Sequence, residues 1–158
     1  MVEMEDMALD ISYHAHPLEF IKPAQTSRDV LYSKPSFIIT VCDKQGRKGV
    51  GECSLIPGLS IESENDVISF LEKQSRNSAF KVSDIPQSLP SVRFAIETAL
   101  TSLKRVGEAN WTGGIPINGL VWMDTAKGML EQVDMLVSKG FKTIKLKVGT
   151  LPFNEELE

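Results

Sequence analysis

The first third of the chain alternates between hydrophobic and polar residues in the manner of β-strands. Residues 9–19 alternate loosely, and the runs Ser36–Asp43 and Gly49–Ser54 flank a short polar turn at residues 44–46. A period of two places alternate side chains on opposite faces of a sheet, and a turn of this length joins antiparallel neighbours. We therefore expect a three-stranded antiparallel meander, with a long polar loop at residues 21–35 between its first two strands.

Two stretches in the middle third carry helical periodicity. The first begins at Ser63, which with Asp66 has the spacing of a capping box, and it runs to Gln74. The second has Ser91 as its expected cap and Gly107 at its end. Spacings of three and four residues put the apolar side chains on one face, so both stretches are expected to pack as amphipathic helices. The apolar stripe of the second is Val92, Ala95, Ile96, Ala99, Leu100, Leu103 and Val106.

The last third changes to a strand, a helix and a strand. Residues 114–121 form a short apolar run, and residues 143–148 form another. Between them, residues 124–140 carry a helical stripe that Asp124 is expected to cap and Gly140 to close. A helix of this length between two short strands predicts a βαβ unit, in which the strands are parallel.

This pattern divides the chain into two parts. We expect residues 1–110 to form an α+β domain and residues 111–158 to begin a second domain that is built from βαβ units. Pro152 opens one more helix shortly before the last residue, Glu158. Two parallel strands leave their faces uncovered, so we expect the natural protein to continue past Glu158.

Charge and composition exclude several classes of partner. The 158 residues carry a formal net charge of −4, with 42% hydrophobic and 24% charged residues. Nucleic acids and anionic membranes attract basic surfaces, so neither is expected as a partner, and a small molecule fits better. No apolar run reaches the roughly 18 residues that a membrane span needs. The acidic start is unlike a secretory signal, so we expect a cytoplasmic protein in which Cys42 and Cys53 are unpaired.

A pair of lysines supplies the candidate catalytic groups. Lys145 and Lys147 alternate with Ile144 and Leu146 in the last strand, so the two ammonium groups project from one face. Gly149 ends the strand and places the pair near its carboxyl end, where (β/α) barrels carry their active sites. Two like charges at close range favour loss of one proton, which suits a base that acts next to a carboxylate. The alternative is a pair of solvated lysines that protects a sheet edge from aggregation.

Four stretches, at Thr26–Arg28, Gly49–Ser60, Ser91–Leu100 and Gly114–Met123, carry a resemblance to a known family. Their sequences resemble the enolase superfamily, in its muconate-lactonizing subgroup. The resemblance covers nearly the whole chain, and the last stretch leads into the lysine strand. It implies an α+β capping domain (a three-stranded antiparallel meander plus helices) at residues 1–110. The first βαβ unit of a truncated (β/α) barrel would follow at residues 111–158.

The resemblance also assigns roles to individual residues. It implies that Lys147 is the general base and that Lys145 is its electrostatic partner. The family uses a magnesium ion to stabilise an enediolate. The carboxylate ligands of that ion and a second catalytic lysine are expected beyond residue 158, so no metal ligand is expected in this chain. The implied substrate-binding residues lie in two cap loops and are Thr26, Ser27, Arg28, Leu55, Ile56 and Pro57.

The implied activity is that of a carbon–oxygen lyase of menaquinone biosynthesis. The base takes a proton next to the carboxylate of a cyclohexadiene substrate, a hydroxyl group leaves, and syn dehydration gives o-succinylbenzoate. Without the metal ligands, the 158-residue chain by itself is expected to be inactive. Two alternatives in the family, a dipeptide epimerase and a muconate cycloisomerase, keep the same lysines and metal. An alternative from another class is a non-catalytic α+β binding module.

Overall fold

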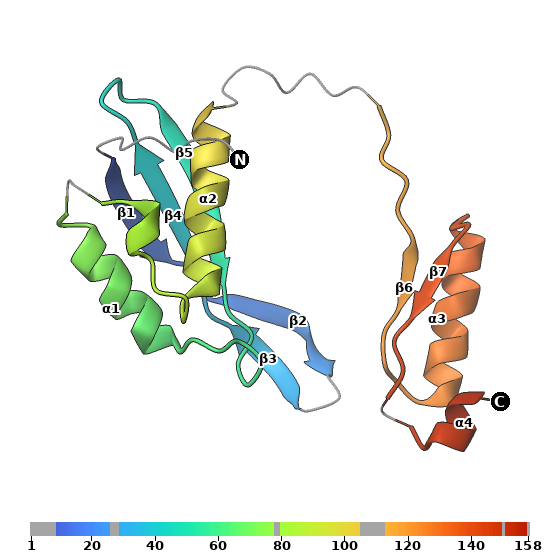
Figure 1. The fold of residues 1–158 in the computed structure, drawn as a ribbon. Coiled ribbons are helices and arrows are strands. Elements are labelled where there is room, and N and C mark those ends of the chain that lie inside the picture. The colour runs from blue at the N-terminus through green and yellow to red at the C-terminus, as the bar shows by residue number, and fades with distance from the viewer. Residues whose placement is uncertain (1–8, 26–28, 78–79, 105–112, 150, 158) are drawn as a thin grey trace. The chain divides into compact units, whose positions relative to one another are not determined.

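The computed structural model describes residues 9–25, 29–77, 80–104, 113–149 and 151–157 (Figure 1). The elements group into two compact units, one of residues 1–21 and 32–110 and the other of residues 22–31 and 111–158. The strands are β1 (Asp10–Ala15), β2 (Leu18–Gln25), β3 (Val30–Lys34), β4 (Ser36–Cys42), β5 (Lys48–Ser54), β6 (Gly119–Val121) and β7 (Ile144–Leu146). The helices are α1 (Glu64–Gln74), α2 (Pro90–Lys104), α3 (Ala126–Ser138) and α4 (Phe153–Leu157), with a short 3-10 helix, η1, at Val82–Asp84.

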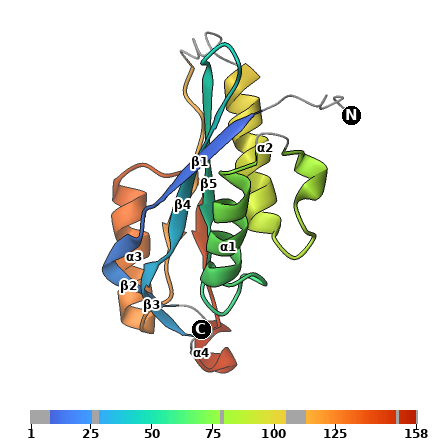
Figure 2. The ribbon, with the colours of Figure 1, turned by 90° about the vertical axis from the view of Figure 1, so that its left-hand side faces the viewer.

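The first unit is built on an antiparallel sheet with the strand order β1-β4-β5, against which α1 and α2 pack (Figure 2). In the central strand β4, Ile39 lies between Tyr13 of β1 and Gly51 of β5. Phe37, Ile39 and Val41 alternate along β4 and are fully buried, as a strand with one face on a core requires. The predicted α+β fold, with a three-stranded antiparallel meander and helices, is confirmed.

Helix α2 approaches β5 closely because two glycines of the strand face it. A Cβ atom added at Gly51 would overlap the carbonyl oxygen of Ala95, and one at Gly49 would overlap that of Ala99. Both alanines are fully buried, so small residues line the contact on both elements. The backbones themselves therefore set the distance between the helix and the sheet.

Asp43 fixes the turn between β4 and β5, where Gly46 adopts a φ of 78°. Its carboxylate accepts hydrogen bonds from the amides of Gln45 and Arg47, at 2.9 Å each, and from Nε of Arg47 at 2.6 Å. Desolvation disfavours the charged carboxylate, but these hydrogen bonds outweigh it and hold the pKa of Asp43 below its ordinary value.

The stretch between β1 and β4 differs from the prediction. In place of a long loop at residues 21–35, the chain forms β2 and β3, which pair in a two-stranded sheet. No side chain of β3 is buried, so burial imposes no alternation on this hairpin, and the sequence pattern could not indicate it. The predicted loop residues Thr26, Ser27 and Arg28 lie outside the described residues.

Helices α1 and α2 begin close to where the periodicity predicts, but only α1 has the predicted cap. At α1 the predicted capping box is present, because the amide of Asp66 donates to Oγ of Ser63 and the amide of Ser63 donates to the Asp66 carboxylate. Helix α2 begins at Pro90, so Ser91 lies in its first turn and does not cap it. Proline is favoured at a first helical position because its missing N–H is not needed there. The predicted end of this helix, Gly107, lies outside the described residues.

Strand β6, helix α3 and strand β7 of the second unit form a βαβ unit, as predicted. β6 and β7 are parallel, with Val121 opposite Leu146. Helix α3 covers one face of the pair, where Val121 is fully buried and Leu136 is nearly so. The strands are shorter than the predicted runs, although a bond from the amide of Lys147 to the carbonyl of Val121 (3.1 Å) continues the pairing. Thr125 caps α3 in place of Asp124, and Gly140 ends the helix with a φ of 84°.

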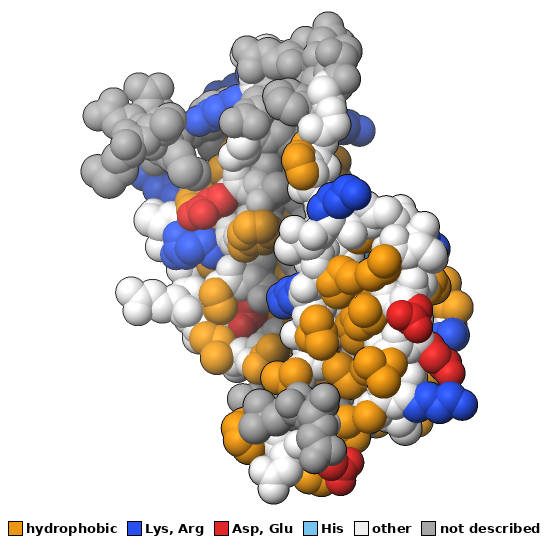
Figure 3. Space-filling view, turned by 90° about the vertical axis from the view of Figure 1, so that its right-hand side faces the viewer, with side chains coloured by type: hydrophobic (Ala, Val, Ile, Leu, Met, Phe, Trp, Pro, Cys, Tyr) orange, Lys and Arg blue, Asp and Glu red, His pale blue; other side chains and the backbone are white. Residues whose placement is uncertain are grey.

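The second unit leaves large hydrophobic side chains in contact with solvent, and several gather over α3 (Figure 3). Parallel sheets are usually covered on both faces, whereas this one has two strands and one long helix. The assignment of residues 1–110 to a capping domain and of residues 111–158 to a barrel stays a prediction. None of the described helices is long and apolar enough to cross a bilayer. Among residues 113–155, the exposed large hydrophobic side chains are Ile115, Ile117, Leu120, Leu130, Met135, Val137, Leu146, Val148 and Phe153.

Substitution of Gly51 by alanine should destabilise the first unit by about 3 kcal/mol, because the new Cβ would overlap the backbone of α2 at Ala95. Urea unfolding followed by circular dichroism measures this change. Gly114→Ala is the matched control, since its Cβ would meet no atom within 4 Å. Equal stability of the two variants would contradict the close contact between β5 and α2.

Asp43→Asn should lower the melting temperature at neutral pH, because the amide loses the charge that its hydrogen-bond donors stabilise. The lowered pKa of Asp43 means that the carboxylate stabilises the fold above the ordinary value of 3.8 and loses this effect as the pH falls further. The gap between variant and parent should therefore narrow below pH 3.8. Asp134→Asn, at an exposed site on α3, serves as the control. A gap that is independent of pH would argue against this role of the charge.

Candidate active site

The lysine pair projects from the face of the β6–β7 sheet opposite α3. Lys145 lies beside Leu120 in the parallel register, and Lys147 follows one residue after β7 ends. Because Val121 of the neighbouring strand packs toward α3, the alternation of side chains puts the lysines on the other side. The structure thus places the two lysines on one face at the carboxyl end of β7. Their catalytic roles stay a prediction.

Lys147 contacts an aromatic ring, whereas Lys145 is exposed. Nζ of Lys147 lies 4.2 Å from the centroid of the Trp122 indole, well within the range of a cation–π interaction. Trp122 follows directly after β6, so both residues belong to the carboxyl ends of adjacent parallel strands. The main chain of Trp122 is bonded twice to the side chain of Gln132 on α3, at 2.8 Å from its amide and 3.2 Å to its carbonyl.

Neither the role of Gln132 nor the contact between Trp122 and Lys147 was predicted from the sequence. One signal was available for the glutamine, since it is a polar residue between the apolar positions of the α3 stripe. A half-buried amide in such a position usually bonds to another element. The contact between Trp122 and Lys147 depends on the register of two strands that are separated by a helix, and no local pattern specifies that register.

The predicted cap loop after β5 is tied down at its start. Leu55 is buried and its amide donates to the carbonyl of Pro35 at 3.2 Å. Within the loop, Oγ of Ser60 accepts a hydrogen bond from the amide of Ile56 at 2.9 Å. Leu55, Ile56 and Pro57 line a cavity of about 560 Å³. The structure therefore brings these three predicted residues together at one cavity, with Ile56 and Pro57 exposed.

Glu62 fastens the end of the same loop to helix α2. Its side chain is 94% buried, and Oε1 accepts a hydrogen bond of 2.6 Å from the amide of Ser91 in the first turn of α2. The positive end of the helix dipole favours a carboxylate there. Oε2 is buried and has no hydrogen-bond partner among the described residues. Sequence analysis missed this residue, because it lies 29 positions before its partner.

The thiol of Cys53 lies in the core beneath this loop. Burial raises the pKa of Cys53 to about 12, and the nearby carboxylates of Glu62 and Glu52 add to the shift. Cys42 is partly exposed, and both cysteines are free, as predicted. Cys53 therefore stays protonated at neutral pH and is excluded as a nucleophile in this unit.

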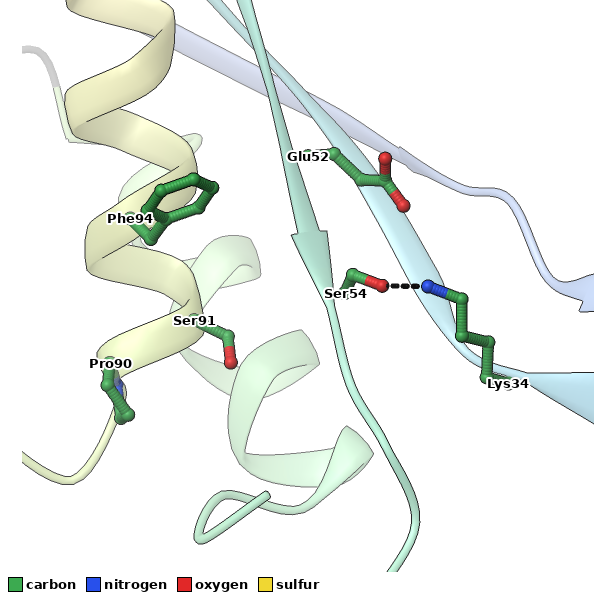
Figure 4. A pocket seen from close by; sticks show the side chains of 6 residues that line it. All are labelled: Lys34, Glu52, Ser54, Pro90, Ser91 and Phe94. Atoms are coloured by element: carbon green, nitrogen blue, oxygen red, sulfur yellow. Dashed lines mark hydrogen bonds between the residues drawn. The ribbon is translucent and has the colours of Figure 1, made fainter. Parts of the chain in front are cut away.

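A second cavity, of about 440 Å³, opens between β5 and the start of α2 (Figure 4). The ammonium group of Lys34 bonds to the hydroxyl of Ser54 on one side, and the rings of Pro90 and Phe94 lie on the other. Among the described residues that line it, none belongs to a predicted cap loop. Because the ammonium group of Lys34 is bonded to Ser54, we assign this lysine a structural role. The cavity therefore adds no residue to the predicted active site.

The described residues do not supply a metal centre. Within the described part of the chain, no group of three or more His, Cys, Asp or Glu side chains is arranged to hold a metal ion. A magnesium ion in a protein usually takes its ligands from carboxylates that converge on one point.

Two curated proteins named o-succinylbenzoate synthase match nearly the whole chain. The protein from Desulfotalea psychrophila is 33% identical over 190 residues, which cover 94% of this chain and 51% of that protein. The protein from Thermosynechococcus vestitus is 26% identical and covers 90% of this chain and 43% of its own length. The chain thus spans about half the length of the curated relatives it matches. No model of a protein family matches the sequence.

Solved structures with the same fold support this match. The o-succinylbenzoate synthase from Thermosynechococcus elongatus, with magnesium in its active site, superimposes on 93% of this chain with a TM-score of 0.71 and 25% identity. This chain covers 45% of that one. A mandelate racemase/muconate lactonizing protein from Herpetosiphon aurantiacus shares the fold alone, with a TM-score of 0.76 and 18% identity. By sequence and by fold, the chain therefore resembles o-succinylbenzoate synthases over about half of their length, in agreement with the resemblance predicted from its sequence.

Proposed function

We propose that this chain supplies the capping domain and the first lysine pair of an o-succinylbenzoate synthase. One observation carries the proposal. In a chain 33% identical to such a synthase, Lys145 and Lys147 lie at the carboxyl end of a parallel strand, on the face that α3 leaves free. Barrel enzymes place their chemistry at this end of their strands. The substrate would be a small-molecule carboxylate in the cytoplasm, with neither nucleic acid nor membrane as partner.

In the proposed reaction, the neutral amine of Lys147 takes the proton from the carbon next to the substrate carboxylate. The electrons of that C–H bond pass into the carboxylate, and Lys145, as an ammonium group, stabilises the charge that develops there. The electrons then return to form the new C=C bond while the C–O bond to the hydroxyl group breaks. The leaving oxygen takes the proton back from Lys147, so water is released and the base is regenerated.

The cap loop would exclude water from this reaction. Leu55, Ile56 and Pro57 offer apolar surface, and fastening at Pro35 and at Ser91 limits how far the loop can move. Exclusion of water strengthens the electrostatic interactions inside a closed site. For the other loop, the sequence supports a contact between Arg28 and a substrate carboxylate, which a guanidinium can bind in a bidentate way.

We further propose magnesium as the cofactor. The match to a synthase that was solved with magnesium in its active site supports this choice. A divalent cation at such a site would stabilise negative charge on the substrate. Because the described residues of this chain form no ligand set, we assign it no ligand, and its own contribution is the lysine pair and the cap loop.

In the product of the complete reading frame, Lys147→Ala should lower kcat for formation of o-succinylbenzoate by about 10²- to 10⁴-fold, the usual effect of losing a general acid and base. The aromatic product can be followed by its ultraviolet absorbance with magnesium present. Lys142→Ala, at an exposed position just before β7, is the matched control and should keep parental activity. Equal losses in the two variants would count against the proposed base. Exchange at a dipeptide α-carbon without dehydration would favour an epimerase instead.

The 158-residue chain by itself should form no o-succinylbenzoate, because its described residues bring no metal ligands to the lysine pair. The assay uses the purified chain with excess magnesium, and a chelator-treated sample gives the background. The product of the complete reading frame is the positive control. Magnesium-dependent dehydration by the purified chain would disprove this prediction.

A further inference from the structure

We propose that Trp122 is a positioning residue, which holds the ammonium group of Lys147 at the carboxyl end of β7, and that Gln132 holds Trp122. This inference rests on the proposed function, in which Lys147 exchanges a proton with the substrate. The proposed function names Lys147 as the base, and this inference adds the group that fixes the position of its amine.

Lys147 needs such a device because its amine is mobile. A lysine side chain has four rotatable carbon–carbon bonds and a compact charge, so its amine can occupy many places. A general base must lie within about 2.6–3.2 Å of the proton that it removes. Lys147 is half-buried, and its Nζ lies 4.2 Å from the centroid of the Trp122 ring. In the protonated form, which returns the proton to the leaving oxygen, attraction between the ammonium group and the face of the indole therefore selects one of these places.

The main chain that carries the indole ring is itself held in place. The side-chain amide of Gln132 accepts a hydrogen bond from the Trp122 amide at 2.8 Å and donates one to the Trp122 carbonyl at 3.2 Å. These bonds tie the end of β6 to the middle of α3. On its other side, β6 is bonded to β7 through the amide of Lys147 and the carbonyl of Val121, at 3.1 Å. The main chains of Trp122 and Lys147 are thus held in register at adjacent strand ends.

The register of the sheet gives the two lysines different neighbours. Lys145 lies opposite Leu120 and is exposed, so its neighbour in the register is aliphatic. The aromatic ring of Trp122 comes two residues after Leu120, just beyond the end of β6, and lies beside Lys147. Only the lysine that the proposal needs in a fixed place is therefore matched to a ring by the register of the sheet, within the described part of the chain.

The first test needs no activity and uses the 158-residue chain. Protons above an aromatic face resonate upfield, so the ε-methylene signals of Lys147 should be shifted upfield of the other lysines in the NMR spectrum. Trp122→Leu should abolish the shift, and Trp122→Phe should keep part of it. Phe153→Leu, an exposed aromatic position on α4, should change nothing. Ordinary ε-methylene shifts in the parent chain would overturn the proposal.

The second test measures kinetics in the product of the complete reading frame. Trp122→Leu should lower kcat by about 10- to 100-fold through misplacement of the amine, with KM changed by less than about twofold. Trp122→Phe should keep most of the parental kcat. The kcat of Gln132→Ala should lie between those of Trp122→Leu and Trp122→Phe. Circular dichroism at matched temperature checks that each variant is folded. A parental kcat in folded Trp122→Leu would overturn the proposal. A parent enzyme that does not dehydrate the substrate, but shows the upfield shift, would refute the proposed function and not the contact.

Discussion

The parallel pairing of β6 with β7 is the constraint on which the candidate site depends. It turns Val121 toward α3 and therefore turns Lys145 and Lys147 the other way, since side chains alternate along each strand. A slip of one residue would exchange the two faces and bury the ammonium groups against Leu136. The hydrophobic contact of α3 with the sheet thus fixes the register and, through it, the place of the lysines.

In the first unit, packing of the helices and the sheet holds the loop between β5 and α1, whose own residues are largely exposed. The glycines of β5 allow α2 to lie close to the sheet, and this brings the first turn of α2 to the buried carboxylate of Glu62. The loop between β5 and α1 is then fastened at both ends while Ile56 and Leu59 stay exposed between them. Rigid packing beneath the loop and apolar residues at its tip are compatible with a cap over a substrate.

The sequence was most informative where burial imposes a period. The stripes of α1 and α2 and the alternation in β4 were visible, because each puts one face on a core. The stripe of α3 also predicted its helix, although Leu136 is the one residue of that helix that is buried in the described part of the chain. The hairpin of β2 and β3 was missed for the converse reason, as no side chain of β3 is buried. Within the site, the common face of Lys145 and Lys147 follows from a period of two. The hydrogen bond from Ser91 to Glu62 and the contact of Lys147 with the Trp122 ring join different parts of the fold. No local sequence pattern specifies such tertiary contacts.

The unequal environments of the two thiols have a consequence for oxidative chemistry. Sulfenic acids and mixed disulfides form from the thiolate, and the pKa of about 12 at Cys53 leaves almost none of that form at neutral pH. Cys42 sits at the end of β4 with its sulfur near the carbonyl of Asp43 and is partly open to solvent. Peroxide or glutathione disulfide would therefore modify Cys42, at the end of β4, and would leave Cys53 in the interior of the sheet reduced.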